Sequence, residues 1–462
     1  MGIGTVALGW LLNRDKLLAT PPAVPRGEQS FDLTPKQPHH TPKAQAMISL
    51  FMHGGPSHMD LTDPKPELQR MNGKTYQGDI QFSDFKNGSK RLMGSRWKFH
   101  KHGECGTEIS ELLPNISGIV DDICLIRSMH TGYNGHEVSI RYMHSGIPSV
   151  TGRPTLGSWL LYGLGSETNN LPSYMVMTDP GGHPVDSVHN WSNGWMPTLF
   201  QGTVLRPKDP RILNLDAPAH LRGRIQEENL GFLEKLNRRH LKRHPGERDL
   251  EARIASYELA ARMQTAAKEA LDISHETEQT HKLYGLDDDA TREYGTRCLI
   301  ARRMVERGVR FVQIYHRGWD VHQFAPEVLP AQALDVDRAA WALIQDLKER
   351  GLFDETLVIW GGEFGRTIYS QGKLSDKNHG RDHHGRCFTT WLAGGGVKAG
   401  FEYGKTDDHS YNILENPVHI RDLNATILHC LGIDHQRLTY RFQGRDFRLT
   451  DVHGNVVRDL LS

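Results

Sequence analysis

Histidines that stand beside acidic residues and glycines are the most informative feature of this sequence. The chain has 26 histidines, and a neutral imidazole is the commonest metal ligand in proteins. In residues 53–63, Asp60 can be either a metal ligand or the N-cap of a helix, and we take it as a ligand. Asp320 and His322 stand two positions apart, so both side chains can reach one ion from an extended segment.

A second set of candidate ligands lies further along the chain. Glu363 directly follows an apolar stretch, where a carboxylate is costly to bury without a partner or a metal. Residues 378–386 contain three His, one Asp and two Arg, and we expect His383 or His384, or both, to bind metal. Mixed oxygen and nitrogen ligands suit divalent Zn, Ca, Mn or Fe better than a thiolate site would, and the pattern leaves open whether one ion or two are bound.

His136 is the main candidate for catalysis. A helix is expected to begin near this residue, and the free N–H groups of a helix N-terminus favour anions. His136 can act as a nucleophile, as a general acid or as a metal ligand. The alternative nucleophiles are the hydroxyl groups of Ser139, Ser128 and Thr131.

Three arginines are candidates for holding an anionic group, because a guanidinium makes bidentate contacts with such groups. We expect Arg366, which closely follows Glu363, to act in catalysis. We expect Arg127 and Arg381 to bind the substrate.

Apolar runs and helical patterns alternate along the chain and predict the elements that position these residues. The predicted strands are 46–52, 122–127, 309–315, 356–360 and 388–393. The predicted helices are 108–120, 290–307, 332–350 and 419–431. This alternation is typical of an α/β fold with a mostly parallel central sheet and helices on both faces. Ligands bind such sheets at the carboxyl ends of the strands, where the segments beginning at His53, Arg127, His316 and Gly361 are expected to lie.

The chain is expected to form one domain over residues 46–462, with a helical insertion at about 220–275 and a long ordered loop region at 178–218. Residues 1–45 are expected to be a signal-like apolar segment followed by an extended linker. The apolar run 2–12 is too short to span a membrane, and no other segment of membrane length is found.

Composition excludes several classes of protein. Lys plus Arg equals Asp plus Glu at 55 each, so charge gives no argument for a nucleic-acid partner. None of the 5 cysteines forms a Cys-x-x-Cys pair, which excludes zinc-finger and thioredoxin-like sites. The oligomeric state is not indicated by the sequence.

Several of these segments together resemble a known family. They are Gly54–Ser57 with Asp60, Gly318-Trp-Asp-x-His322, Gly362–Thr367, Gly380–His383 and Gly394–Gly396. The chain is similar in them to the exported bacterial sulfatase-like proteins of unknown function in the alkaline phosphatase and sulfatase superfamily. The resemblance implies an alkaline-phosphatase-like fold and metal ligands in the order Asp60, Asp320, His322, Glu363 and His383 or His384. It also implies export to the periplasm or cell envelope, with the stretch 2–12 resembling the tail of a twin-arginine signal.

Two departures from the superfamily pattern affect the expected chemistry. Phe364 stands where alkaline phosphatases and sulfatases place a His, so a second metal would need His316 or His379 in its place. His136 stands where sulfatases carry the modified Cys, so a formylglycine mechanism is not supported.

These features favour a metal-dependent hydrolase of phosphate or sulfate esters, acting on a small molecule or a glycan. The alternative is a catalytically silent metal- or glycan-binding protein on the same fold. A third reading is other metal-dependent chemistry known in the superfamily, such as mutase or phosphonate reactions. Fold alone does not decide among them.

Overall fold

The computed structural model describes residues 32–77, 90–216, 218, 220, 222–244, 248–371, 374–375 and 378–462. The apolar segment expected at 2–12 therefore lies outside the described residues, as does most of the expected linker. Among the described residues, no helix combines the length and the apolar character that a membrane span requires.

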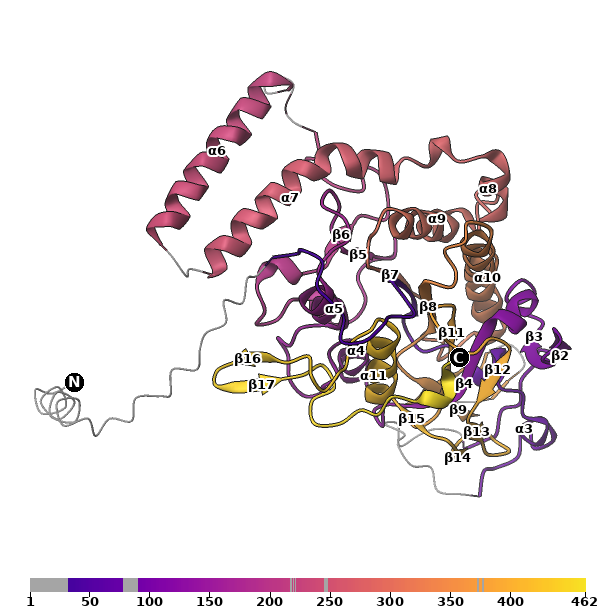
Figure 1. Ribbon diagram of the computed structural model, residues 1–462. Helices are drawn as coiled ribbons and strands as arrows, with labels where there is room; N and C mark the ends of the chain where they lie inside the picture. Colours follow the sequence, from indigo (N-terminus) through magenta and orange to yellow (C-terminus); the bar gives the residue numbers. More distant parts are fainter. Residues whose placement is uncertain are drawn as a thin grey trace, which may run out of the picture.

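A nine-stranded sheet forms the centre of the protein (Figure 1). Its strands follow the order β12-β4-β11-β8-β1-β7-β5-β6, and β15 pairs with β4. Their bounds are β1 Ala46–Met52, β4 Ile123–His130, β5 Tyr174–Met177, β6 Thr203–Leu205, β7 Phe311–His316, β8 Thr356–Gly361, β11 Phe388–Ala393, β12 Phe401–Tyr403 and β15 Val418–His419. Pairing is parallel throughout, except that β11 runs antiparallel to both β4 and β8. The predicted α/β class and all five predicted strands are confirmed.

Helices cover both faces of the sheet because its central strand is apolar on both faces. In β1, Ile48 and Leu50 join the core under α9 and α10, whereas Met47 and Phe51 join the core under α4, α5 and α11. Successive side chains of a strand point to opposite faces, so one fully apolar strand can serve both layers. The helix bounds are α4 His136–Ser145, α5 Leu156–Leu164, α9 Arg292–Glu306, α10 Ala325–Glu349 and α11 Ile420–Cys430.

The predicted helices 290–307, 332–350 and 419–431 are confirmed as α9, α10 and α11. The prediction of a helix at 108–120 was wrong. Residues Thr107–Ser110 form strand β3, which pairs with β2 (Phe99–His102), and a 3-10 helix follows at Ile116–Asp122. Asp337 on α10 accepts hydrogen bonds from the backbone N–H groups of Asn115 and Ile116, so tertiary contacts hold the short turn in place of a longer helix.

The region expected to be a helical insertion contains two long helices, α6 Arg224–Arg243 and α7 Arg248–Leu271. The shorter helices are α2 His58–Leu61, α3 Pro66–Arg70 and α8 Glu278–Leu283. Two-stranded hairpins complete the described fold: β9 Gly365–Ser370 with β10 Arg381–His384, β13 Lys405–Thr406 with β14 Ile413–Glu415, and β16 Tyr440–Phe442 with β17 Arg445–Phe447.

The burial of His144 on α4 predicts that the folded protein loses stability in acid. Its ring lies 3.1 Å from the Tyr315 hydroxyl and 3.3 Å from the Gln313 amide, and burial lowers the pKa of His144 to about 3. The unfolded chain binds a proton near the ordinary His pKa of 6.5 and the folded chain does not, so stability falls as the pH drops below 6.5.

We expect this one residue to cost about 2 kcal/mol of stability between about pH 7 and pH 5. Thermal unfolding as a function of pH should therefore show a shallower decline for His144→Gln than for the unchanged protein. The exposed His189→Gln is the matched control and should leave the slope unchanged. Equal slopes for all three proteins would contradict the assignment.

Candidate metal centre

The carboxyl ends of β1, β7 and β8 meet at one edge of the sheet, and the candidate site is built on the turns that follow them. Gly54 directly follows His53 at the end of β1 and has a φ of +118°. A Cβ at Gly54 would lie 2.3 Å from the backbone nitrogen of Asp320, so only glycine allows the two loops to approach this closely. The Gly54 N–H also donates to both carboxylate oxygens of Glu363, at 3.0 and 3.1 Å.

Five of the predicted residues converge at this edge, namely His136, Asp320, His322, Glu363 and His383. The Nδ1 of His136 lies 2.8 Å from Glu363 Oε1, and its Nε2 lies 3.2 Å from Asp320 Oδ2. The Nε2 atoms of His322 and His383 lie 2.8 and 2.9 Å from Asp320 Oδ1. The expected start of a helix at His136 is confirmed, since His136 is the first residue of α4.

Two groups within this cluster could hold a metal ion. His136, Asp320 and His383 offer ligand atoms that all lie within 4.8 Å of one another, and so do His53, His136 and Glu363. Ligand atoms on opposite sides of one ion are about 4 Å apart. Small adjustments of these side chains would therefore accommodate an ion in either group.

The hydrogen bonds of His383 indicate which of its ring nitrogens is available to a cation. Its Nδ1 lies 2.7 Å from the carbonyl oxygen of Asn134, which can only accept, so Nδ1 carries the proton. In the neutral ring the lone pair is then on Nε2, which faces Asp320 Oδ1. Two acceptors this close require a second proton or a cation between them, and a His held by its other nitrogen is the usual arrangement of a metal ligand.

His136 and Asp320 are the most strongly perturbed titratable pair of the cluster. Burial alone would lower the pKa of His136, but its hydrogen bonds to Asp320 and Glu363 raise that pKa to about 9. The same contacts, with His322, His383 and Arg366, hold the pKa of Asp320 far below its usual value despite partial burial. A ring held between two carboxylates in this way is either an imidazolium or a metal ligand.

Arg366 holds the loops of the site together and has little capacity left for a substrate. Its guanidinium donates to the carbonyl oxygens of Gly55, Gly54 and Trp319 and to Asp320 Oδ1 at 2.8 Å. The side chain is buried, whereas 42% of the Asp320 side chain is exposed. Arg366 therefore positions Asp320 from behind, and Asp320 faces the solvent.

The structure does not bring Asp60 and Arg381 to the cluster. They form a buried bidentate ion pair, with Nε–Oδ2 and Nη2–Oδ1 distances of 2.8 and 3.1 Å. Ser57 also donates to Asp60 at 2.5 Å. Both oxygens of Asp60 are thus engaged by partners from its own chain, and the guanidinium of Arg381 is engaged by Asp60 and the Thr367 carbonyl.

Three further predicted residues also lie apart from the cluster. Arg127 forms a bidentate pair with Glu402, at 2.8 and 3.1 Å. Ser139 is buried and donates to the Tyr133 carbonyl at 3.0 Å. The Nε2 of His384 lies 2.8 Å from the Tyr411 carbonyl.

The two residues considered as replacement ligands are engaged elsewhere. His316 accepts from Trp319 Nε1 at 2.9 Å and donates to Asp335 at 2.8 Å, so both of its ring nitrogens are used. His379 bonds to the Ser375 carbonyl at 3.0 Å. Phe364 packs its ring on His383 and His136, with centroids 4.4 and 4.9 Å apart, and so fills part of the space beside the cluster.

Two residues of the site were not among the predicted site residues. His53 approaches Glu363, with Nε2 4.0 Å from Oε1, and accepts from the Val185 N–H at 3.2 Å. His53 directly follows β1, just as Glu363 shortly follows β8. This position after a strand was the feature of the sequence that could have identified His53 as a site residue. Asn134 orients His383 through its backbone carbonyl, for which a sequence carries no signal.

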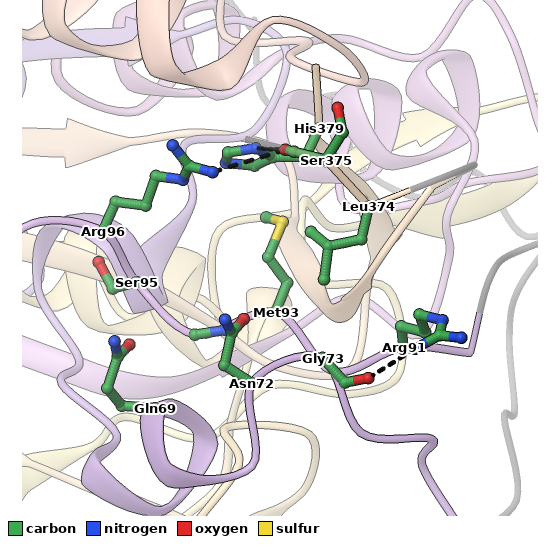
Figure 2. Close-up of a pocket in the computed structure, with 11 residues that line it drawn as sticks. Gln69, Asn72, Gly73, Arg91, Met93, Ser95, Arg96, Leu374, Ser375 and His379 are labelled. Atoms are coloured by element: carbon green, nitrogen blue, oxygen red, sulfur yellow. Dashed lines mark hydrogen bonds between the residues drawn. The ribbon is translucent and has the colours of Figure 1, made fainter. Parts of the chain in front are cut away.

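A polar cavity of about 820 Å³ lies beside the β9–β10 hairpin that carries His383 (Figure 2). Figure 2 shows His379, Ser375 and Arg96 together on one side of it and Arg91 on another. Its lining residues are Gln69, Asn72, Gly73, Arg91, Met93, Gly94, Ser95, Arg96, Leu374, Ser375 and His379. His379 is four positions from His383, so the extended chain between them spans at most about 13 Å. His379 therefore ties the cavity to the strand that carries His383, although the cavity and the candidate centre share no lining residue.

These features define an α/β protein with a candidate metal centre at the carboxyl edge of its sheet. The chain belongs to the family described as "Protein of unknown function (DUF1501)", whose model matches residues 44–461. A comparison with curated proteins gave no match.

Solved structures of two related classes resemble the chain in broad outline. The PsFucS1 sulfatase from Pseudoalteromonas sp. is 12% identical, with a TM-score of 0.38 over 91% of this chain and 72% of that one. An alkaline phosphatase superfamily protein from Vibrio parahaemolyticus is 10% identical, with a TM-score of 0.36 over 87% and 69%. The alkaline phosphatase of the Antarctic bacterium TAB5 is 12% identical, with a TM-score of 0.31 over 78% and 92%.

The pairing of Asp60 with Arg381 yields a prediction that separates structural residues from ligands. Asp60→Ala would leave a buried guanidinium without its partner, which costs about 3–5 kcal/mol. We expect thermal unfolding at a markedly lower temperature, with metal content unchanged. Glu402→Ala, which breaks the more exposed pair with Arg127, is the control and should cost less than about 1 kcal/mol. Loss of metal from Asp60→Ala without loss of stability would show that Asp60 is a ligand.

Proposed function

We propose that this protein is a metal-dependent hydrolase of phosphate or sulfate esters. The observation that carries the proposal is the convergence of His136, Asp320, Glu363 and His383, which come from four separate segments of the chain. Two imidazoles with a carboxylate suit Zn or Mn better than Ca, which prefers a site made of oxygen ligands alone.

The donor set fits a divalent ion held by Asp320, His136 and His383, with Glu363 and His53 as the further group around His136. A bound ion would polarise the ester oxygens and lower the pKa of a water molecule. The group of ligands is open to solvent at Asp320, because the Asp320 side chain is 42% exposed while Glu363 is fully buried. An ester would therefore approach from the Asp320 side.

The positions of the candidate nucleophiles favour attack by water. Ser139 donates to the Tyr133 carbonyl and Ser128 to the Asn416 carbonyl, so neither hydroxyl points into the cluster. Thr131 bonds to the Tyr133 and Gly385 carbonyls. Both ring nitrogens of His136 face carboxylates, which suits a ligand or positioning residue better than a nucleophile.

The neighbouring cavity supports a glycan as the body of the substrate. Its lining combines amide and guanidinium groups of Gln69, Asn72 and Arg96 with the apolar side chains of Met93 and Leu374. Such a mixture suits a sugar, which presents hydroxyl groups at its edges and C–H groups on its faces.

One observation favours a second candidate function, a silent metal- or glycan-binding protein. The two arginines expected to hold the anionic group, Arg127 and Arg381, both form ion pairs within the chain. A protein without a guanidinium at its ester site would depend on the ion alone to bind the anion.

For the location of the protein we propose export to the cell envelope, supported by the signal-like stretch 2–12.

The test of function combines metal analysis of the purified protein with release of a chromogenic phosphate or sulfate from model esters. Stoichiometric metal together with turnover that a chelator abolishes would support the hydrolase. Metal without turnover across phosphate and sulfate esters would favour the silent binding protein. Absence of both would contradict a metal-dependent function.

Glu363 gives the sharpest test of the ligand set. Glu363→Ala removes the carboxylate that binds both His136 and Gly54, so we expect metal affinity to fall by about 100-fold or more. Elemental mass spectrometry after dialysis measures this loss, and circular dichroism checks that the variant is folded. The matched control is Glu402→Ala, which should keep its metal. Full metal content in folded Glu363→Ala would show that Glu363 is not a metal ligand.

A further inference from the structure

The long helix α6 carries large apolar side chains on a face that no other described part of the chain covers. None of its residues is buried, and Ile225, Phe232 and Leu236 are 50%, 64% and 45% exposed. A surface helix normally turns its apolar stripe toward a core, and a larger apolar patch left exposed marks an interaction site.

The helix α6 has two apolar faces, and α7 packs against one of them. Leu230 and Leu233 line the cleft between α6 and α7 together with Tyr257, and Gln226 donates to Gln264 across it. Figure 1 shows α6 at the periphery of the molecule, beyond α7. At 100° per residue, Ile225, Phe232 and Leu236 fall within a narrow arc of α6 that lies roughly opposite Leu230. This second face points away from α7.

The spacing of this second face is that of a helix-pairing seam. Ile225, Asn229, Phe232 and Leu236 follow one another at intervals of four, three and four residues, as the core positions of a coiled coil do. We propose that this seam pairs with α6 of a second copy of the chain, antiparallel and about a twofold axis. In that register Ile225 packs against the partner's Leu236, and Asn229 lies beside the partner's Phe232. A twofold interface requires such self-complementarity, and the seam provides it.

The charges of α6 favour the antiparallel direction. Its acidic residues lie between 227 and 234, whereas its basic residues, apart from Arg224, lie between 235 and 243. In the proposed register Glu228, beside the seam, faces the partner's Lys235 on each side of the axis. A parallel pair would bring the basic halves together. The pairs within the helix, such as Arg224 with Glu228 at 3.2 Å, are highly exposed and therefore weak enough to exchange partners.

Asn229 explains why the pairing would be specific but modest in strength. A polar residue in a helix seam selects the register at a cost in stability. The whole helix is about 30 Å long, so the interface is smaller than that of a permanent dimer. We therefore expect dimerisation at roughly micromolar concentrations of protein.

The test measures the oligomeric state of the full chain by sedimentation velocity over a range of concentrations. Phe232→Glu places a carboxylate at the centre of the seam and should raise the dissociation constant of the dimer at least tenfold. The matched control is Leu414→Glu on β14. Leu414 is 61% exposed, which is close to the 64% of Phe232, and its replacement should leave the dissociation constant of the dimer unchanged. Circular dichroism of the variants confirms that α6 stays folded.

A charge exchange then tests the register. Glu228→Lys alone and Lys235→Glu alone each place like charges opposite one another and should weaken the dimer several-fold. The double variant restores opposite charges and should restore the affinity. A chain that stays monomeric at about 100 μM, a dimer insensitive to Phe232→Glu, or a double variant no better than the single ones would overturn the proposal.

Discussion

The buried carboxylate of Glu363 is the interaction on which the candidate site depends. Its oxygens accept the Gly54 N–H and bond to His136, so one side chain joins the turns after β1 and β8 to the start of α4. A fully buried carboxylate is costly unless its partners are in place. The same requirement that keeps these segments together therefore also assembles the nitrogen and oxygen atoms that an ion would need.

Burial decreases across the cluster from Glu363 to Asp320, so the Asp320 end is the one that a ligand could reach. Glu363 is fully buried at the inner end, whereas Asp320 at the outer end is 42% exposed and is held by Arg366 from behind. Carboxylates alone would repel a phosphate or sulfate ester. The imidazoles around Asp320, and a cation among them, would reverse the sign of the local charge.

The three candidate arginines look equivalent in the sequence, but their tertiary contacts determine what each one binds. Arg366, Arg381 and Arg127 each carry a guanidinium that could bind an ester, yet each is engaged by carbonyl or carboxylate groups of its own chain. In a large domain with many loop segments near one edge, buried arginines can satisfy several backbone carbonyls at once. In the proposed hydrolase, binding of the anionic group would therefore depend on the metal centre itself.

The sequence alone determined the five main strands, the helices α9, α10 and α11, and the ligand candidates at the strand ends, because these depend on local apolar pattern and on the geometry common to parallel sheets. It also pointed to His136 as the start of a helix. Only the tertiary structure decided that Asp60 lies against Arg381 rather than in the cluster, since that choice depends on a partner 321 positions away. The tertiary structure also decided which of His383 and His384 faces the cluster. Neighbours on the β10 strand point to opposite faces, so His383 meets Asp320 while His384 meets Tyr411, and no local pattern reveals which face the site occupies.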